Sequence, residues 1–413
     1  MQNQNSDQMI ASLAEQNLEK ANKYFQRALQ EDDSESLLAL GEYLERIGFY
    51  PQAKAIFLQI RPSFPEVNIN LAQIASEDGD MDEAFNYLNE IAADSQYYLE
   101  ALVTMADLYD AEGLTDVAYE KLLQARQLSE DPLLIFGLAE LALSLENYQT
   151  AIEHYAQLDN REILENTGIS TYERIGRAYA ALGKFEVAIE FLEKALEIEF
   201  DDQIVFELAC LLYDQGNAQK ANIYFKQLDA LNPDFEGYEL PYALSLHEEH
   251  QTAEALRLLQ QSLSKNEFDS RVLILASQYA YEEHDKKAAE NYLLKALEVA
   301  EEEEEVLLPL SNLYLEAERF EDVIALDSGA VDNLLTKWNL ARAYRELEDD
   351  EKALVYYQEL AKELTDNPEF LEDYIYFLRE LGQQAQTADL IETYLHLVPD
   401  DHQMIDLKND IKQ

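Results

Sequence analysis

The sequence predicts an all-α protein, a solenoid built from about twelve helix-turn-helix repeats. Of its 413 residues, 47% are hydrophobic, and only 12 are Gly and 9 are Pro. Leu, Ala, Glu, Gln and Tyr dominate, which favours helix over strand. Apolar residues recur at helical spacing along the whole length, and a small residue returns about every 34 residues, the period of a repeat array.

The first complete repeat begins at Leu37. Its first helix carries an apolar stripe at helical spacing, made of Leu37, Leu40, Gly41 and Leu44. Gly48 then ends the helix, because glycine readily adopts the left-handed conformation found at helix C-termini. The second helix carries Ala53 and Phe57 on one face and stops before Pro65, which cannot continue a helix interior.

A small residue in the second helix marks each repeat. It falls at Ala21, Ala53, Ala84, Ala118, Ala151, Ala188, Ala221, Ala255, Ala289, Val323, Ala353 and Ala388. Two antiparallel helices approach closely only where no large side chain stands between them, and larger residues on either side then fill the interior. We therefore expect these positions, with Gly41 and Gly176 opposite, to lie at close helix-helix contacts.

This pattern resembles the tetratricopeptide repeat (TPR) family. Leu37-x2-Leu40-Gly41-x2-Leu44, followed by Ala53-x3-Phe57 and Pro65, is similar to the family pattern W-x2-L-G-x2-Y, A-x3-F and P, with the Trp replaced. The resemblance covers nearly the whole chain. It implies a right-handed superhelix whose first helices line a concave groove. In its length and its acidic composition, the chain also resembles the long acidic TPR proteins of Gram-positive bacteria, of the YpiA type.

Irregular spacing divides the expected array into four segments. These are an N-terminal capping repeat (1–33), repeats over 34–160, repeats over 161–328 that follow an enlarged loop, and C-terminal repeats with a capping helix (329–413). The enlarged loop is expected from Asn160 to Ile169. Asp327, Ser328 and Gly329 are expected to shorten the preceding helix. Residues 401–413 are predicted to form a capping helix with a polar outer face, which the end of a solenoid requires.

The charge of the chain limits its partners. Lys and Arg number 30 against 84 Asp and Glu, a net charge of −54, which repels phosphate backbones and anionic headgroups. We therefore expect no nucleic-acid partner. We also expect no membrane insertion, since no segment approaches about 18 uninterrupted apolar residues. Cys210 is the only cysteine, so no intramolecular disulfide is possible. With no signal-peptide pattern at the N-terminus, the expected location is the cytoplasm.

Signatures of catalysis are absent from the sequence. It has no phosphate-binding loop, no G-x-S-x-G elbow and no C-x-x-C pair. His247 and His250 are three residues apart, out of register for a zinc motif, and we interpret them as part of a polar turn. We interpret the acidic run Glu301–Glu305 as a solvated helix end. We interpret Cys210 as a small hydrophobic residue with a structural role. No catalytic, cofactor-binding or metal-binding residue is predicted.

Partner-binding residues are predicted on a second stripe of each first helix, the face that lines the groove in TPR proteins. The candidates are Phe136, Arg177, Phe206, Trp338, Arg342, Arg345 and Arg379. Arg and Trp are enriched among interface hot spots. Two alternatives stay open: the apolar residues pack against the adjacent first helix, and the arginines neutralise neighbouring carboxylates.

The sequence therefore predicts a non-catalytic scaffold that holds protein or peptide partners in the groove, with partner identity and oligomeric state open. The Lys and Asn clamp for chaperone tails is not reproduced, because only Asn312 fits it. One alternative is a regulatory, peptide-sensing TPR protein, although the residues before Leu37 leave no room for the DNA-binding helices of that class. An α-toroid hydrolase is a less favoured alternative, since its carboxylates must converge in a closed barrel.

Overall fold

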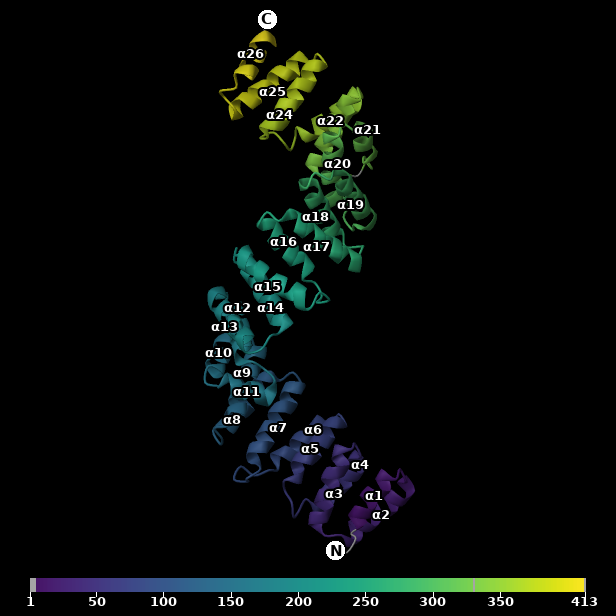
Figure 1. Ribbon diagram of the computed structural model, residues 1–413, viewed down its shortest axis with the longest axis vertical. Helices are drawn as coiled ribbons and strands as arrows, with labels where there is room; N and C mark the ends of the chain where they lie inside the picture. Colours follow the sequence, from purple (N-terminus) through teal and green to yellow (C-terminus); the bar gives the residue numbers. More distant parts are fainter. Residues whose placement is uncertain (1–4, 330, 412–413) are drawn as a thin grey trace. The chain divides into compact units, whose positions relative to one another are not determined.

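A computed structural model describes residues 5–329 and 331–411 (Figure 1). The chain divides into two compact units, Met1–Leu208 (unit 1) and Ala209–Gln413 (unit 2). The described residues form helices, turns and loops and contain no strand. The predicted all-α solenoid fold is confirmed.

Unit 1 is a succession of helices joined by short turns. They are α1 (Asn5–Ala14), α2 (Leu18–Glu31), α3 (Ser34–Arg46), α4 (Tyr50–Ile60), α5 (Val67–Glu77), α6 (Met81–Asn89), α7 (Tyr98–Ala111), α8 (Thr115–Arg126), α9 (Pro132–Ser144), α10 (Tyr148–Tyr155), α11 (Asn160–Thr167), α12 (Thr171–Ala181) and α13 (Phe185–Ile198). The boundary between the two units falls inside the next helix, α14 (Asp202–Asp214).

Unit 2 continues the same alternation. Its helices are α15 (Ala218–Leu231), α16 (Glu239–Glu248), α17 (Thr252–Lys265), α18 (Ser270–Glu282), α19 (Lys286–Val299), α20 (Glu304–Glu316), α21 (Phe320–Ala325), α22 (Leu334–Glu346), α23 (Asp350–Leu360), α24 (Pro368–Glu380), α25 (Gln384–Leu397) and α26 (His402–Ile411). No helix in the described part of the chain is long and apolar enough to cross a bilayer.

Within each unit, the first helix of a repeat packs on the second, and the second packs on the first helix of the next repeat, as α3, α4 and α5 do. Small residues allow the close approach, as predicted. A Cβ added to Gly41 would lie 2.6 Å from the Phe57 ring, and one added to Gly176 would lie 2.9 Å from Leu192. Ala53 and Ala188 opposite them are fully buried.

Each repeat turns from its first to its second helix through one residue in the left-handed conformation. Glycine fills the turn at Gly48, Gly79, Gly113, Gly183, Gly216 and Gly382, and a non-glycine residue fills it at Gln16, Glu146, His250, His284, Glu318 and Glu348. After Gly48, the Phe49 amide donates to the Leu44 carbonyl at 2.8 Å, which satisfies an orphan carbonyl of α3.

Three local predictions are wrong. The segment expected as an enlarged loop is largely helix α11, whose N-terminus is capped by the Asp159 side chain and which ends at Gly168 in the left-handed conformation. Eight residues with a single buried hydrophobe, Ile163, were too short to show helical periodicity. Second, Thr387 and not Ala388 is the fully buried small residue of α25. Third, His247 lies in the last turn of α16, so that only His250 belongs to the turn.

The helix before the junction, α21, is short, as expected. Two carboxylates, those of Asp327 and Glu304, accept hydrogen bonds from the segments that flank the junction. α21 has 6 residues and ends at Ala325, two residues before Asp327. The Asp327 carboxylate accepts hydrogen bonds from the hydroxyls of Tyr344 (2.9 Å) and Tyr356 (2.8 Å). Glu304, expected to be solvated, accepts the amides of Asp332 (2.6 Å) and Asn333 (3.0 Å) and so fixes the entry into α22.

Candidate partner-binding face

The first-helix face of unit 2 carries four of the predicted partner-binding residues, on α22 and α24. Trp338 is half-buried, with its Nε1 donating to Asp373 Oδ2 at 2.7 Å. Its ring meets Phe370 edge-on at 5.6 Å between centroids. The indole is therefore used in packing α22 against α24, one of the two alternatives left open by the sequence.

Arg345 is likewise bound within the protein. Its guanidinium pairs with Asp373 Oδ1 at 3.0 Å and with the two oxygens of Glu380 at 2.5 and 2.8 Å. It also lies over the Phe377 ring, 5.7 Å from the centroid. Burial opposes its charge, but the hydrogen bond with Glu380 and the nearby acidic groups outweigh that effect and raise the pKa of Arg345. Arg345 thus neutralises carboxylates on the neighbouring helix.

Asp373 is the common partner of this cluster. Besides Trp338 and Arg345, the buried Tyr357 hydroxyl donates to its Oδ2 at 2.7 Å. Burial, and then the charge and hydrogen bond of Asp373, raise the pKa of Tyr357, so this hydroxyl keeps its proton. The carboxylate therefore ties α22, α23 and α24 together.

Arg342 and Arg379 differ from Arg345. Both side chains are exposed on α22 and α24. Neither forms an ion pair within residues 5–329 and 331–411. They are the two arginines of the predicted site in unit 2 that are available to an incoming group.

In unit 1, the predicted residues lie among other side chains of the same face. Arg177 pairs with both oxygens of Glu207 (2.8 and 3.0 Å) and with Glu173 (2.5 Å). Burial opposes the charge of Arg177, yet these carboxylates raise its pKa. The half-buried Phe136 tilts against Tyr155 with centroids 6.2 Å apart. Phe206, on α14, is also half-buried.

Three polar bonds between successive first helices of unit 2 share a separation of 35 residues that the sequence reading missed. In unit 2, His247 Nε2 contacts Glu282 Oε2 (2.6 Å), the Tyr281 hydroxyl donates to Glu316 (2.6 Å), and Arg345 binds Glu380. Each pair is 35 residues apart, one repeat plus one residue. The signal in the sequence was the recurrence of Glu at 248, 282 and 316.

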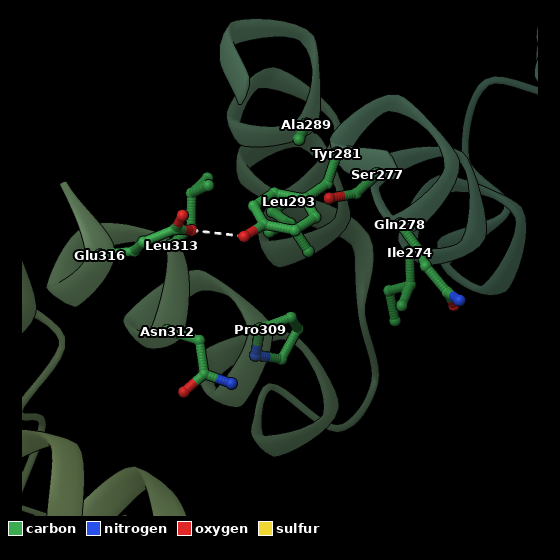
Figure 2. A pocket seen from close by; sticks show the side chains of 10 residues that line it. All are labelled: Ile274, Ser277, Gln278, Tyr281, Ala289, Leu293, Pro309, Asn312, Leu313 and Glu316. Carbon is green, nitrogen blue, oxygen red and sulfur yellow. Dashed lines mark hydrogen bonds between the residues drawn. The ribbon is translucent and has the colours of Figure 1, made fainter. Parts of the chain in front are cut away.

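A pocket of about 400 Å³ opens on the first-helix face of unit 2, between α18, α19 and α20 (Figure 2). Its lining is largely apolar with a few polar groups: Ile274, Ser277, Gln278, Tyr281, Ala289, Leu293, Pro309, Asn312, Leu313 and Glu316. Pro309 lies inside α20, where it supplies no backbone donor. Of these residues, the sequence analysis named Ala289 as a small packing residue and Asn312 as a match to the chaperone clamp, and it assigned neither to a pocket.

Two amide side chains at the pocket are oriented by neighbours outside it. Gln278 Nε2 donates to Glu282 Oε1 at 3.0 Å, which leaves Gln278 Oε1 as an acceptor. Asn339 Nδ2 donates to Asn312 Oδ1 at 2.6 Å, which leaves Asn312 Nδ2 as a donor. One acceptor on α18 and one donor on α20 match the N–H and C=O of a polypeptide backbone.

The carboxylates beside the pocket are ionised at neutral pH. Burial disfavours the charge of Glu282, but hydrogen bonds from Gln278 and His247 lower its pKa overall. The Glu316 carboxylate accepts from Lys286 and Tyr281, and these bonds lower its pKa as well. No cluster of His, Cys, Asp and Glu within the described ranges could hold a metal ion.

Family models match four stretches of the chain. One described as YpiA-like, C-terminal tetratricopeptide repeats matches residues 335–401, and one described as YpiA-like, tetratricopeptide repeats matches residues 111–163. A general tetratricopeptide repeat model matches residues 169–202, and a model of the tetratricopeptide repeat protein 21 ARM repeat matches residues 8–122. The matches fall in both units, and three of the four models describe tetratricopeptide repeats.

Known proteins of the same class are similar over most of the chain. The TPR repeat-containing protein YpiA of Bacillus subtilis (strain 168) is 26% identical over 341 residues, which cover 81% of this chain and 80% of YpiA. Tetratricopeptide repeat protein 21B of Xenopus laevis is 23% identical over 78% of this chain, but the match spans only 27% of that longer protein.

Two solved structures align with parts of the chain. YrrB, described as a TPR protein with an unusual peptide-binding site, aligns with a TM-score of 0.37 at 18% identity, covering 48% of this chain and 97% of YrrB. Naa15/Naa10 bound to HypK-THB aligns with a TM-score of 0.44 at 14% identity, covering 92% of this chain and 66% of that one. Similarity at this level says nothing about what this chain binds. From its repeats and its relatives, the chain is a tetratricopeptide repeat protein of the YpiA type, a repeat scaffold of the protein-interaction class.

Proposed function

We propose that this protein is a non-catalytic cytoplasmic scaffold that binds a partner protein or peptide along the first-helix face of unit 2. The observation that carries the proposal is the pocket between α18 and α20. Its volume of about 400 Å³ lies within the range of ligand-binding pockets, which are apolar with a few placed polar groups. It suits an apolar side chain of an extended segment.

The polar groups support a polypeptide ligand. Gln278 Oε1 accepts and Asn312 Nδ2 donates, so a bound backbone satisfies both while its side chain enters the pocket. Further along the same face, the exposed Arg342 and Arg379 offer guanidinium groups to carboxylates or carbonyl oxygens of the partner. Trp338 and Arg345 support the face from within, because they hold α22 against α24.

Photo-cross-linking tests the location of the partner. A benzophenone amino acid is placed at Gln278 or at Asn312 in the full-length protein, and the cross-linked product from native cytoplasm is identified by mass spectrometry. The matched control carries the same group at Leu294, an exposed residue of α19 that does not line the pocket. The partner, once purified, is then titrated against the unmodified protein.

The expected result is one partner joined from positions 278 and 312, absent from position 294, that binds in solution. Arg342→Ala with Arg379→Ala is expected to weaken this binding while circular dichroism stays helical, because neither arginine has an ion-pair partner to lose within the described residues. Equal cross-linking from the control position, or a partner that binds only unit 1, contradicts the proposal. So does a turnover assay that detects catalysis by the purified protein.

A further inference from the structure

Every first helix that ends in unit 2 ends in an acidic residue. The last residues are Asp214, Glu248, Glu282, Glu316, Glu346 and Glu380, for α14, α16, α18, α20, α22 and α24. In unit 1 the corresponding helices end in Ala14, Arg46, Glu77, Ala111, Ser144 and Ala181. The acidic row is therefore a property of unit 2 and does not follow from the high acidic content of the whole chain.

This placement is electrostatically unfavourable for the isolated chain. The C-terminal end of a helix carries the negative pole of the helix dipole, and cations are the side chains that it stabilises. All six residues of the row are exposed. Glu316 and Glu380 are paired with Lys286 and Arg345, and Glu282 contacts His247. Asp214, Glu248 and Glu346 have no ion pair in the part of the chain that the structure describes. A cationic group placed beside these helix ends would relieve this repulsion.

Two residues of the acidic row, Glu282 and Glu316, lie at the pocket. Glu316 lines the pocket, and Glu282 holds the Gln278 side chain at its rim. Figure 2 shows Glu316 and Tyr281, joined by their hydrogen bond, among the residues around the pocket. Glu316 already accepts from Lys286 and Tyr281. Glu282 accepts from Gln278 and contacts His247, so a ligand cation would share these carboxylates with groups of the protein. An apolar cavity and two ionised carboxylates therefore lie close enough to meet neighbouring residues of one ligand.

We infer that unit 2 recognises an extended segment of a partner protein in which an apolar residue is accompanied by Lys or Arg. The apolar side chain fills the pocket, and the cation meets Glu282 and Glu316. The two ligand residues are within about two positions of each other, because an extended chain advances about 3.3 Å per residue. This inference rests on the proposed function and specifies its ligand. A phosphorylated or acidic segment is repelled by the same row.

A library of random heptapeptides displayed on phage, selected on the full-length protein, tests the inference. Glu282→Gln with Glu316→Gln removes two charges beside the pocket. Glu298→Gln with Glu321→Gln removes the same two charges from exposed positions on α19 and α21 and is the matched control. Gln278→Trp covers the pocket, and Leu294→Trp places the same indole outside it.

On the wild type we expect enrichment of peptides with an apolar residue and Lys or Arg within two positions of it. Glu282→Gln with Glu316→Gln keeps the apolar preference and loses the basic one, and the enriched peptide binds about tenfold more weakly, the effect of lost charge pairs of this kind. Gln278→Trp loses both preferences. The two control variants behave as the wild type.

Absence of a basic preference, or its equal loss in Glu298→Gln with Glu321→Gln, overturns the inference. The proposed function then stands or falls separately, on cross-linking from positions 278 and 312. If a partner is cross-linked there but its bound segment lacks Lys and Arg, the scaffold is correct and the ligand class is wrong. If no peptide is enriched and no partner is cross-linked, both fail.

Discussion

Six of the repeats turn through a residue other than glycine in the left-handed conformation. For an L-residue with a side chain this conformation costs about 1–2 kcal/mol, because Cβ crowds the following carbonyl. Glycine adopts it without that cost. The turns at Gln16, Glu146, His250, His284, Glu318 and Glu348 therefore each hold a small local strain that the surrounding packing outweighs.

Replacing Glu348 by Gly is expected to raise the free energy of unfolding by about 1 kcal/mol, since the strained φ of 60° becomes an ordinary one. The converse, Gly382→Ala, is expected to lower it by a similar amount, although nothing lies within 4 Å of the added Cβ. Urea unfolding of the two variants measures both changes. Destabilisation by Glu348→Gly would show that its side chain has another role.

Asp327 gives a second prediction at the residue scale, in the pH dependence of stability. Burial disfavours its charge, but hydrogen bonds from Tyr356, Tyr344 and the Gly329 amide lower its pKa overall. Conversely, burial and the bond to Asp327 raise the pKa of Tyr344 to about 12. A carboxyl whose folded pKa is depressed stabilises the fold above its unfolded pKa, and this contribution is lost as pH falls through the folded value.

Asp327→Asn is therefore expected to destabilise the protein at pH 7, and the difference from the wild type should shrink below about pH 4, the ordinary value for Asp. Urea midpoints of both proteins between pH 7 and pH 3 measure it. Asp332→Asn, a nearby exposed position, is the control. A difference that stays constant with pH would mean that the carboxylate charge contributes nothing at this junction.

At the scale of the helix, the close contact between paired helices depends on side-chain volume. Ala188 is fully buried, and a Cβ added to Gly176 would lie 3.3 Å from the Ala188 carbonyl oxygen and 2.9 Å from Leu192. The contact between α12 and α13 at Gly176 and Ala188 is therefore fully packed and cannot accept a larger side chain without a shift of the helices.

Ala188→Leu is expected to cost about 1–3 kcal/mol through overpacking. Thermal unfolding followed by circular dichroism measures the loss. Glu186→Leu, at an exposed site in the first turn of the same helix, is the matched control and should change the midpoint little. An unchanged midpoint for Ala188→Leu would mean that α12 and α13 can separate freely.

Contacts within one repeat could be predicted from the sequence, and contacts between repeats could not. Gly41, Ala53 and Phe57 lie close together in the chain and repeat with a fixed period, so their packing was readable. The bond from Trp338 to Asp373 joins residues 35 apart, and nothing in either local pattern selects that partner among 84 acidic residues. The pocket at Gln278 and Asn312 was missed for the same reason.

Helix α11 and the non-glycine turns were missed for a different reason. α11 has 8 residues and one buried hydrophobe, too few for periodicity to distinguish a helix from a loop. Glu348 and His284 adopt a conformation that glycine signals in a sequence and that glutamate and histidine do not. The boundaries of the four segments expected from the irregular spacing stay predictions.

For the whole molecule, the net charge of −54 sets the dependence on salt. Self-repulsion of like charges disfavours the compact state, and added salt screens charges more than about 8 Å apart at physiological ionic strength. Most carboxylates have no cation available, since acidic residues outnumber Lys and Arg 84 to 30. Screening of repulsion should therefore outweigh the weakening of ion pairs such as Lys54–Glu83.

Raising sodium chloride from about 0.05 to 0.5 M is expected to raise the thermal midpoint, because the Debye length shortens several-fold from low to high salt. Differential scanning calorimetry measures the shift, and an equal ionic strength of sodium sulfate separates screening from specific ion effects. A midpoint that falls with sodium chloride would mean that ion pairs, and not repulsion, dominate the electrostatic free energy of folding.

The separation of 35 residues that several cross-repeat bonds share has a consequence for changes in chain length. Excision of 34 residues, from 249 to 282, removes Glu282 and brings Glu316 to the same distance along the chain from His247. His247 then meets Glu316 at the place that Glu282 occupied. Loss of half that length leaves His247 opposite a residue of the wrong helix. Shortening by whole modules is thus the size change that this architecture accommodates.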